Sequence, residues 1–449
     1  MLWSRGLCHD RGVSYDPSTY RELAERAWAW VLTQVRQGAE GVWLTEYPGQ
    51  TEPGDFPFGM HSGVGGLAHA MEEIQLTRPL AAVELALCEN VREALALRVP
   101  EETAYDYFDG LTSIIGALIA LHAGGAELAV ARLRELATPS GWPASWIGPP
   151  KAMPGGRCND ATLGTASVLL GAVWAHRHDV PEAAELAAHA ADILLAEREQ
   201  RGNGVYWPFI PLRFLTGEDV QMPNWSHGQA GVVASLAVAG MALDRSDLIE
   251  VATSGADYLL TLADRSDGGL RLPHRIPGLP ELAPFTYSWC HGPTGTSLLF
   301  AALDRAGVAS VSGATPAELE RACLHSLRVS GIPARISPGF WDNDGRCCGT
   351  AGAGEVILSF WQRHGREDDL AFGVALGDAI VDRAVSDGDD AFWRFIEHRN
   401  DDPLLAPSPG WMQGAAGIVA YLFRLARLLA QGQEAKAVPR MDTWWTLPD

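Results

Sequence analysis

A short glycine signature occurs seven times along this chain of 449 residues, each time followed by an apolar run. Successive first glycines are separated by between 47 residues (Gly63 to Gly110) and 65 residues (Gly349 to Gly414), which leaves room for two helices and their connections. Such internal repetition is typical of folds built by stacking one supersecondary unit. The seven signatures are Ser62-Gly63-Val64-Gly65-Gly66, Asp109-Gly110-Leu111-Thr112-Ser113, Leu163-Gly164-Thr165-Ala166-Ser167, His227-Gly228-Gln229-Ala230-Gly231, His291-Gly292-Pro293-Thr294-Gly295, Cys348-Gly349-Thr350-Ala351-Gly352 and Gln413-Gly414-Ala415-Ala416-Gly417.

Two kinds of predicted helix alternate along the chain. The residues after each signature are nearly all apolar or small, as in 232–239 and 418–422, and a helix that is apolar all round is buried on every side. The segments between these runs are amphipathic, for example 181–198 and 317–329, and we expect them to be solvated on one face. One inner and one outer helix in each of seven repeats predicts an all-α fold, an (α/α)7 toroid made of a double ring of helices.

Long irregular segments, rich in Pro, Gly and Trp, precede several signatures. If all inner helices run in one direction, these segments gather at one mouth of the ring, where loops on a rigid scaffold commonly carry function. We therefore expect the residues just before each first glycine to face a common cavity. The segments are 139–159, 202–226, 265–289, 331–346 and 400–412, within a single expected domain of residues 1–449.

Charge and hydropathy exclude several classes of partner. The chain has 55 acidic and 34 basic residues, a formal net charge of −21, whereas nucleic acids and anionic membranes require basic patches. No run of about 18 apolar residues is present, so we expect no membrane span. The N-terminus lacks the charged and then apolar pattern of a secretory signal. These features predict a cytoplasmic protein.

Three of the seven cysteines fall at signature turns of two adjacent repeats, namely Cys290, Cys347 and Cys348. Adjacent repeats are neighbours in a ring, so their sulfurs are expected to converge. Thiolates favour zinc, and three protein ligands with one open position are typical of a catalytic zinc site. The alternative is that these are small residues buried at helix starts. The other cysteines are interpreted as structural (Cys8, Cys88, Cys323) or left out of the ligand set (Cys158, two residues before Asp160).

Two histidines at signature turns are further candidates. His291 follows Cys290 directly, so one of the pair can bind metal while the other lines the cavity. His227 lies one repeat earlier and is the better candidate for a general acid or base, because imidazole titrates near neutral pH. A purely structural imidazole is the alternative for His227.

The elements Trp-Cys-His-Gly-Pro-Thr-Gly at 289–295, Cys-Cys-Gly-Thr-Ala-Gly at 347–352 and Ser-His-Gly-Gln-Ala-Gly at 226–231 resemble the LanC cyclases and LanC-like proteins. The resemblance covers essentially the whole chain and implies an (α/α)7 barrel with zinc at one mouth. It matches Cys290 and Cys347 to the first two zinc ligands of the family. His227 matches the proposed acid or base, and Asp160 matches its partner aspartate.

The chain departs from the family pattern at two positions. Cys348 stands where most members have a histidine ligand, as in a subset with three thiolates. Thr286 occupies the place of a family arginine four residues before the first zinc cysteine, and Arg157 or Arg346 is the candidate replacement for stabilising the enolate. We expect Thr286, Trp289, His291 and Arg346 to line the substrate cavity.

The resemblance implies a stand-alone lanthionine-type cyclase that adds peptide cysteine thiols to dehydroalanine or dehydrobutyrine. The expected partners are a dehydrated precursor peptide, a separate dehydratase and a synthetase complex, since the chain has room for the ring alone and no Gly-rich phosphate loop followed by Lys. Two alternatives stay open. The zinc can activate an external thiol such as glutathione, or the ring can be a non-catalytic peptide-binding toroid, because fold does not determine function.

Overall fold

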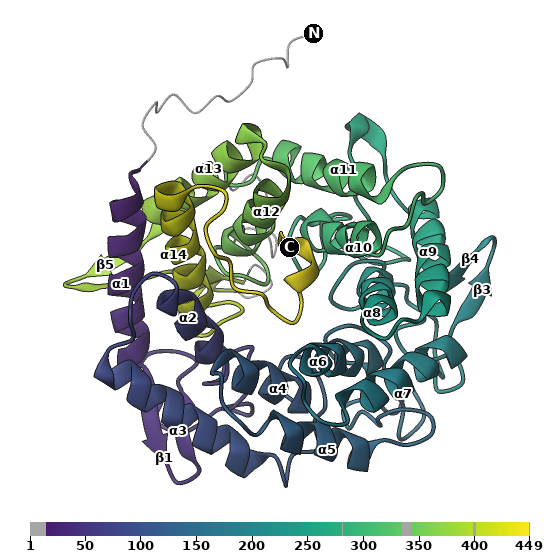
Figure 1. Ribbon diagram of the computed structural model, residues 1–449, viewed down its shortest axis with the longest axis horizontal. Coiled ribbons are helices and arrows are strands. Elements are labelled where there is room, and N and C mark those ends of the chain that lie inside the picture. The colour runs from purple at the N-terminus through teal and green to yellow at the C-terminus, as the bar shows by residue number, and fades with distance from the viewer. Residues whose placement is uncertain (1–14, 281, 335–342, 398–400, 449) are drawn as a thin grey trace.

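In the computed structural model, which describes residues 15–280, 282–334, 343–397 and 401–448, the helices form two concentric rings (Figure 1). The inner ring consists of α2 (Gly66–Gln75), α4 (Leu111–Ala120), α6 (Thr165–Arg177), α8 (Gln229–Ala242), α10 (Pro293–Arg305), α12 (Thr350–His364) and α14 (Ala415–Gln431). The outer ring consists of α1 (Pro17–Thr33), α3 (Ala82–Arg98), α5 (Ala126–Leu136), α7 (Ala183–Ala196), α9 (Ser246–Thr261), α11 (Pro316–Val329) and α13 (Glu367–Arg383). The predicted all-α toroid is confirmed.

Each inner helix begins at a signature glycine and packs against the helix that follows it in the outer ring. Inner helices are buried on all sides, as predicted from their composition, and every residue from Gln229 to Gly240 in α8 is buried. The last pair is different, because α14 packs against α1 from the other end of the chain. The first helix therefore supplies the seventh outer helix and closes the ring.

The signature glycines are required by close approach of the preceding loop. A Cβ atom on Gly228 would overlap the carbonyl oxygen of Met222, and one on Gly349 would overlap the carbonyl oxygen of Asn343. The same carbonyl groups accept the first N–H groups of the helices, from Gln229 (3.1 Å) and from Thr350 (2.9 Å). The loop thus caps the helix where a side-chain cap is absent.

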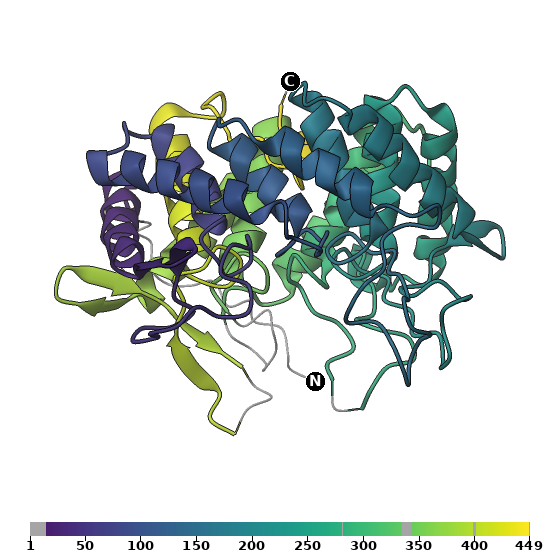
Figure 2. The same cartoon turned by 90° about the horizontal axis from the view of Figure 1, so that it is seen from below.

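The long connections lie on one side of the helix rings, opposite the C-terminus (Figure 2). The predicted segment 331–346 is described only in part, since 335–342 lie outside the described residues, as do residue 400 of the last segment and Cys8. In the described residues, four short antiparallel strand pairs, which the sequence analysis did not predict, lie between helices: β1 (Val35–Gly38) with β2 (Gly41–Leu44), β3 (Glu199–Arg201) with β4 (Gly204–Tyr206), β5 (Val385–Asp387) with β6 (Asp390–Phe392), and β7 (Arg394–Ile396) with β8 (Leu404–Pro407).

The C-terminal segment enters the middle of the ring at the end opposite the long loops (Figures 1 and 2). Its short 3-10 helix, Trp444–Thr446, packs against both α10 and α12. The indole of Trp445 is fully buried and donates a hydrogen bond to the carbonyl oxygen of Leu298 (2.9 Å). The C-terminus therefore fills the far end of the barrel.

A second 3-10 turn, Ser266–Gly268, lies in the loop after α9.

Below the mouth, buried charges join inner helices to the C-terminal segment. Glu355 of α12 accepts a hydrogen bond from Arg424 of α14 (2.7 Å), and both side chains are almost fully buried. Arg440 and Arg346 lie 4.0 and 3.9 Å from the same carboxylate. Burial opposes ionisation of Glu355, but the three surrounding guanidinium groups outweigh it and lower its pKa to about 2.

Candidate metal centre and acid–base pair

The residues two positions before the first glycines, one from each repeat, are joined in a closed ring of hydrogen bonds at the mouth. In repeat two the ring passes through two consecutive residues, Phe108 and Tyr107, and main-chain groups form all of the bonds except one. The bonds run from Ser226 N–H to Cys290 O (2.9 Å), Cys290 N–H to Cys347 O (3.3 Å), Cys347 N–H to Met412 O (2.6 Å), Met412 N–H to His61 O (3.1 Å), His61 N–H to Phe108 O (3.1 Å), Tyr107 N–H to Thr162 O (2.9 Å) and Thr162 Oγ1–H to Ser226 O (2.9 Å).

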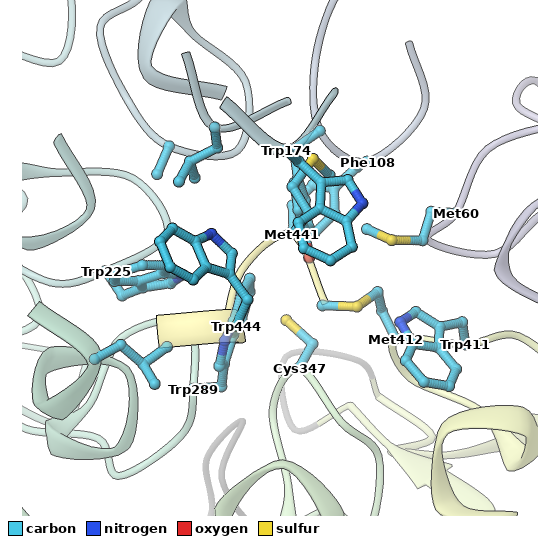
Figure 3. Close-up of a cluster of buried hydrophobic side chains, with 14 of the residues drawn as sticks. Met60, Phe108, Trp174, Trp225, Trp289, Cys347, Trp411, Met412, Met441 and Trp444 are labelled. Carbon is cyan, nitrogen blue, oxygen red and sulfur yellow. The ribbon is translucent and has the colours of Figure 1, made fainter. Parts of the chain in front are cut away.

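This ring brings the three predicted cysteines together, although 57 residues separate Cys290 from Cys347 in the sequence. The Sγ atoms of Cys290, Cys347 and Cys348 all lie within 4.8 Å of one another, and all three residues are buried. The Sγ of Cys348 is 3.6 Å from that of Cys290 and 3.4 Å from that of Cys347. Figure 3 shows Cys347 among the side chains that converge on the middle of the ring.

The sulfur positions fit a tetrahedral zinc ion. Two sulfurs bound to one zinc at about 2.3 Å in tetrahedral geometry lie about 3.8 Å apart, close to the separations seen here. The neighbouring thiols of Cys347 and Cys348 hold the pKa of Cys290 well below its usual value, and in turn the anionic Cys290 raises the pKa of both neighbours. Without a cation, the negative charge of one thiolate opposes ionisation of the other two thiols. Three buried sulfurs of this kind form a donor set suited to a soft divalent cation.

His227, which lies two residues before α8, forms the second part of the site with Asp160. The Nδ1 of His227 lies 2.8 Å from Oδ2 of Asp160, which has no solvent exposure, and 3.2 Å from the hydroxyl oxygen of Thr162. Asp160 is itself fixed by the main-chain N–H of Leu163 (2.8 Å to Oδ1). Burial alone would lower the pKa of His227, but the hydrogen bond to Asp160 and the charges of Asp160 and Cys290 raise it.

The model of the family described as "Lanthionine synthetase C-like protein" matches residues 54–432, most of the chain. The chain belongs to the lanthionine synthetase C-like family. No curated protein matches the sequence.

Among solved structures, nisin cyclase has a TM-score of 0.51 at 13% identity, covering 83% of this chain and 89% of its own. A GH76 α-mannanase of Bacteroides thetaiotaomicron has a TM-score of 0.49 at 11% identity, covering 92% and 96%. A cellobiose 2-epimerase of Spirochaeta thermophila has a TM-score of 0.45 at 12% identity, covering 92% and 97%. At such identity the likeness to nisin cyclase shows the shared fold.

The ring of His291 in this LanC-like chain lies beside that of His227, and its nitrogens do not belong to the group of side chains, among the described residues, that could hold a metal ion. Its ring lies 5.3 Å from that of His227 and 4.4 Å from that of His274, between centroids. Burial lowers the pKa of His291 to about 4. His291 is therefore a half-buried ring in contact with two other imidazoles.

The other residues predicted to line the cavity are deeply buried. Thr286 donates its hydroxyl hydrogen to the carbonyl oxygen of His291 (2.9 Å). Trp289 packs among buried aromatic rings, 6.2 Å from Trp225 between centroids (Figure 3). Arg346 lies over the ring of Trp411 and 3.6 Å from the Asp442 carboxylate in the charged layer below the mouth.

Arg157, the other candidate replacement for the family arginine, lies in the loop before α6. Its Nε donates to the carbonyl oxygen of Ser140 (3.0 Å), and its guanidinium also contacts Gly155 O and lies over the ring of Phe214. These contacts hold the guanidinium against its own loop and against Phe214 of the loop before α8.

Sequence reasoning missed two residues beside the site. His61 occupies the position in repeat one that Cys290 and Cys347 occupy in theirs, so aligning the seven repeats on their first glycines would have identified it. His274, whose ring contacts His291, lies in the middle of a long loop and has no such marker.

In the described part of the chain, no helix combines the length and apolar character needed to cross a bilayer.

Proposed function

We propose that this protein is a zinc-dependent cyclase that adds cysteine thiols of a dehydrated precursor peptide to dehydroalanine or dehydrobutyrine residues. The observation that carries the proposal is the meeting, at one mouth of the barrel, of three buried sulfurs and a hydrogen-bonded His–Asp pair. Membership of the lanthionine synthetase C-like family supports the same reaction class. Cys290, Cys347 and Cys348 would hold the metal.

Zinc bound by these sulfurs would lower the pKa of a substrate thiol and keep it reactive. In the reaction a C–S bond forms at the β-carbon of the dehydro residue, and the electrons of its C=C bond move to the carbonyl oxygen as an enolate. The α-carbon then accepts a proton. His227 is proposed to donate it from Nε2, because Nδ1 faces the Asp160 carboxylate. The proton lost by the next substrate thiol restores His227.

We further propose a cytoplasmic location and dependence on a separate dehydratase, with a synthetase complex as a further partner. The described chain contains six free cysteines, as expected of a reducing compartment. Thioether formation as proposed consumes dehydro residues, so another enzyme must produce them from serine and threonine.

The experiment is to incubate the purified protein with a dehydrated cysteine-containing peptide and count alkylatable thiols over time. Thiols should disappear while the peptide mass stays unchanged, because addition within one peptide neither adds nor removes atoms. Cys347→Ala should abolish the loss, whereas Cys88→Ala, which removes a half-buried cysteine of an outer helix, should not. Thiols that persist with the wild-type protein would contradict the proposal, and a mass increase with added glutathione would favour an external thiol instead.

A further inference from the structure

A groove opens beside the mouth, between the loop before α6 and the loop before α8, with a volume of about 660 Å³. Binding sites for small molecules and peptide side chains commonly have volumes of about 300–1,000 Å³ and mostly apolar walls. The walls here are largely apolar, and the lining residues that matter for the argument are Trp146, Ile147, Phe209, Ile210, Met222 and Arg275.

Two aromatic rings connect the wall of the groove to His227. Trp146 is 53% exposed, an unusual state for a tryptophan, and its ring lies 6.0 Å from that of Phe209 between centroids. Phe209 in turn lies edge-on to His227, with centroids 6.1 Å apart. Because Phe209 lines the groove and touches His227, the groove and the site share one wall.

Arg275 supplies an unused cationic donor on the same wall. Its Nε is buried without a hydrogen-bond partner, and none of the carboxylates in the described residues forms an ion pair with it. Its neighbour His274 contacts His291 beside the metal-ligating sulfurs. Arg275 is half-buried, and a guanidinium with an unpartnered N–H donor favours a ligand that offers it an oxygen acceptor.

We propose that this groove binds the segment of the substrate peptide next to the reacting residue. An apolar side chain of the peptide packs against Trp146 and Phe209, and a main-chain carbonyl oxygen accepts a hydrogen bond from Arg275. This inference rests on the proposed function and names the substrate class that the site prefers: peptides with a large apolar residue beside the reacting cysteine or dehydro residue. Glutathione has no such side chain, so the groove favours a peptide over that free thiol.

The test measures binding without turnover, by fluorescence anisotropy of two labelled peptides. Both contain one dehydrobutyrine and a cysteine blocked by methylation, and they differ only in a phenylalanine or a serine beside the cysteine. The wild-type protein should bind the phenylalanine peptide about tenfold more tightly or better, since burying a large aromatic side chain is worth well over one tenfold step. Trp146→Ala should remove most of this preference. Leu97→Ala, at a 74% exposed residue of an outer helix, should preserve it.

Arg275→Met should weaken the binding of both peptides to a similar extent, because both offer main-chain carbonyl groups. Arg366→Met, at an exposed side chain, should leave the binding of both peptides unchanged. Equal binding of the two peptides by the wild-type protein, or an unchanged preference in Trp146→Ala, would overturn the proposal. Thiol loss with unblocked peptides is followed separately. If cyclisation proceeds without any preference, the groove inference is wrong and the proposed function stands. If the preference is present but thiols persist, the groove binds peptide and the proposed function fails.

Discussion

The Nδ1 of His227 lies 2.8 Å from the Oδ2 of Asp160, although 67 residues separate them in the chain. Asp160 lies in the loop before α6 and His227 precedes α8, and these two inner helices pack side by side. The carboxylate is fully buried, so it fixes the orientation of the imidazole and favours its protonated form. The toroid thus brings this His–Asp pair together from two successive repeats.

Replacing Asp160 should move the pH dependence of the reaction. The interactions with Asp160 raise the pKa of His227, so an acid role is available at low pH and is lost as the pH rises through that raised pKa. In Asp160→Asn the pKa of His227 should fall, and the alkaline loss of activity should begin at lower pH. A pH–rate profile of thiol loss checks this, with Asp192→Asn at an exposed side chain as the control. An unshifted profile would argue against His227 as the proton donor.

Replacing His227 should separate proton transfer from metal binding. General acid catalysis typically contributes a factor of about 10²–10⁴, so His227→Ala should slow cyclisation by roughly that amount. The variant should retain its zinc, since the imidazole is not among the metal-ligating atoms. Single-turnover kinetics and metal analysis on the same preparation check both parts. Loss of zinc together with activity would mean that His227 supports the metal centre instead.

The buried pair of Arg424 and Glu355 should be costly to break. Arg424→Met leaves Glu355 with fewer cationic partners in the core, and removing one partner of a buried ion pair commonly costs about 3–5 kcal/mol in free energy of unfolding. Arg245→Met, which breaks exposed ion pairs with Asp192 and Asp247, should cost about 0–1 kcal/mol. Urea unfolding curves of the two variants give the comparison, and equal costs would contradict it.

The same glutamate should make stability depend on acid pH. Its folded-state pKa is about 2 against an ordinary value of 4.5, so its contribution is fully present above about pH 4.5 and is lost as the pH falls toward 2. Unfolding free energies of the wild-type protein and Glu355→Gln should therefore converge as the pH is lowered through this range. A difference that stays constant with pH would be inconsistent with an ionised Glu355.

The signature glycines should not tolerate a methyl group. In Gly228→Ala the new Cβ would overlap the Met222 carbonyl oxygen, and relieving such overpacking typically costs about 1–3 kcal/mol. Gly124→Ala is the matched control, because a Cβ there meets nothing within 4 Å. Thermal unfolding of the two variants measures the difference. If Gly228→Ala were destabilised no more than the control, close packing would not explain why glycine recurs at the signature positions.

The repeated glycines made the ring predictable from sequence, because the Gly-small pattern and the apolar run after it reflect the same close packing in every unit. The convergence of Cys290 and Cys347 followed from their equivalent places in adjacent repeats. The structure adds the physical link, a ring of hydrogen bonds through these positions. The pairing of α1 with α14 was not predictable in this way, because the closing helix lies at the opposite end of the chain from its partner.

Residues placed by long loops escaped the sequence analysis. Phe209, His274 and Arg275 lie outside any repeat position, and their places beside the site depend on how two loops pack against each other. The exposed side chain of Trp146 carried no sequence signal that distinguishes it from the buried tryptophans such as Trp142. Trp289 and Thr286, both predicted to line the substrate cavity, are buried: Trp289 packs among aromatic rings, and Thr286 donates a hydrogen bond to the carbonyl oxygen of His291.

The metal content of the purified protein tests the central claim most directly. We predict about one zinc per chain in the wild-type protein and in Cys88→Ala, and loss of that zinc in Cys347→Ala and Cys290→Ala, with the helical content of all four proteins unchanged. Zinc retained by both site variants, or a wild-type protein that binds no zinc when it is supplied, would contradict the claim that the three sulfurs form a metal centre.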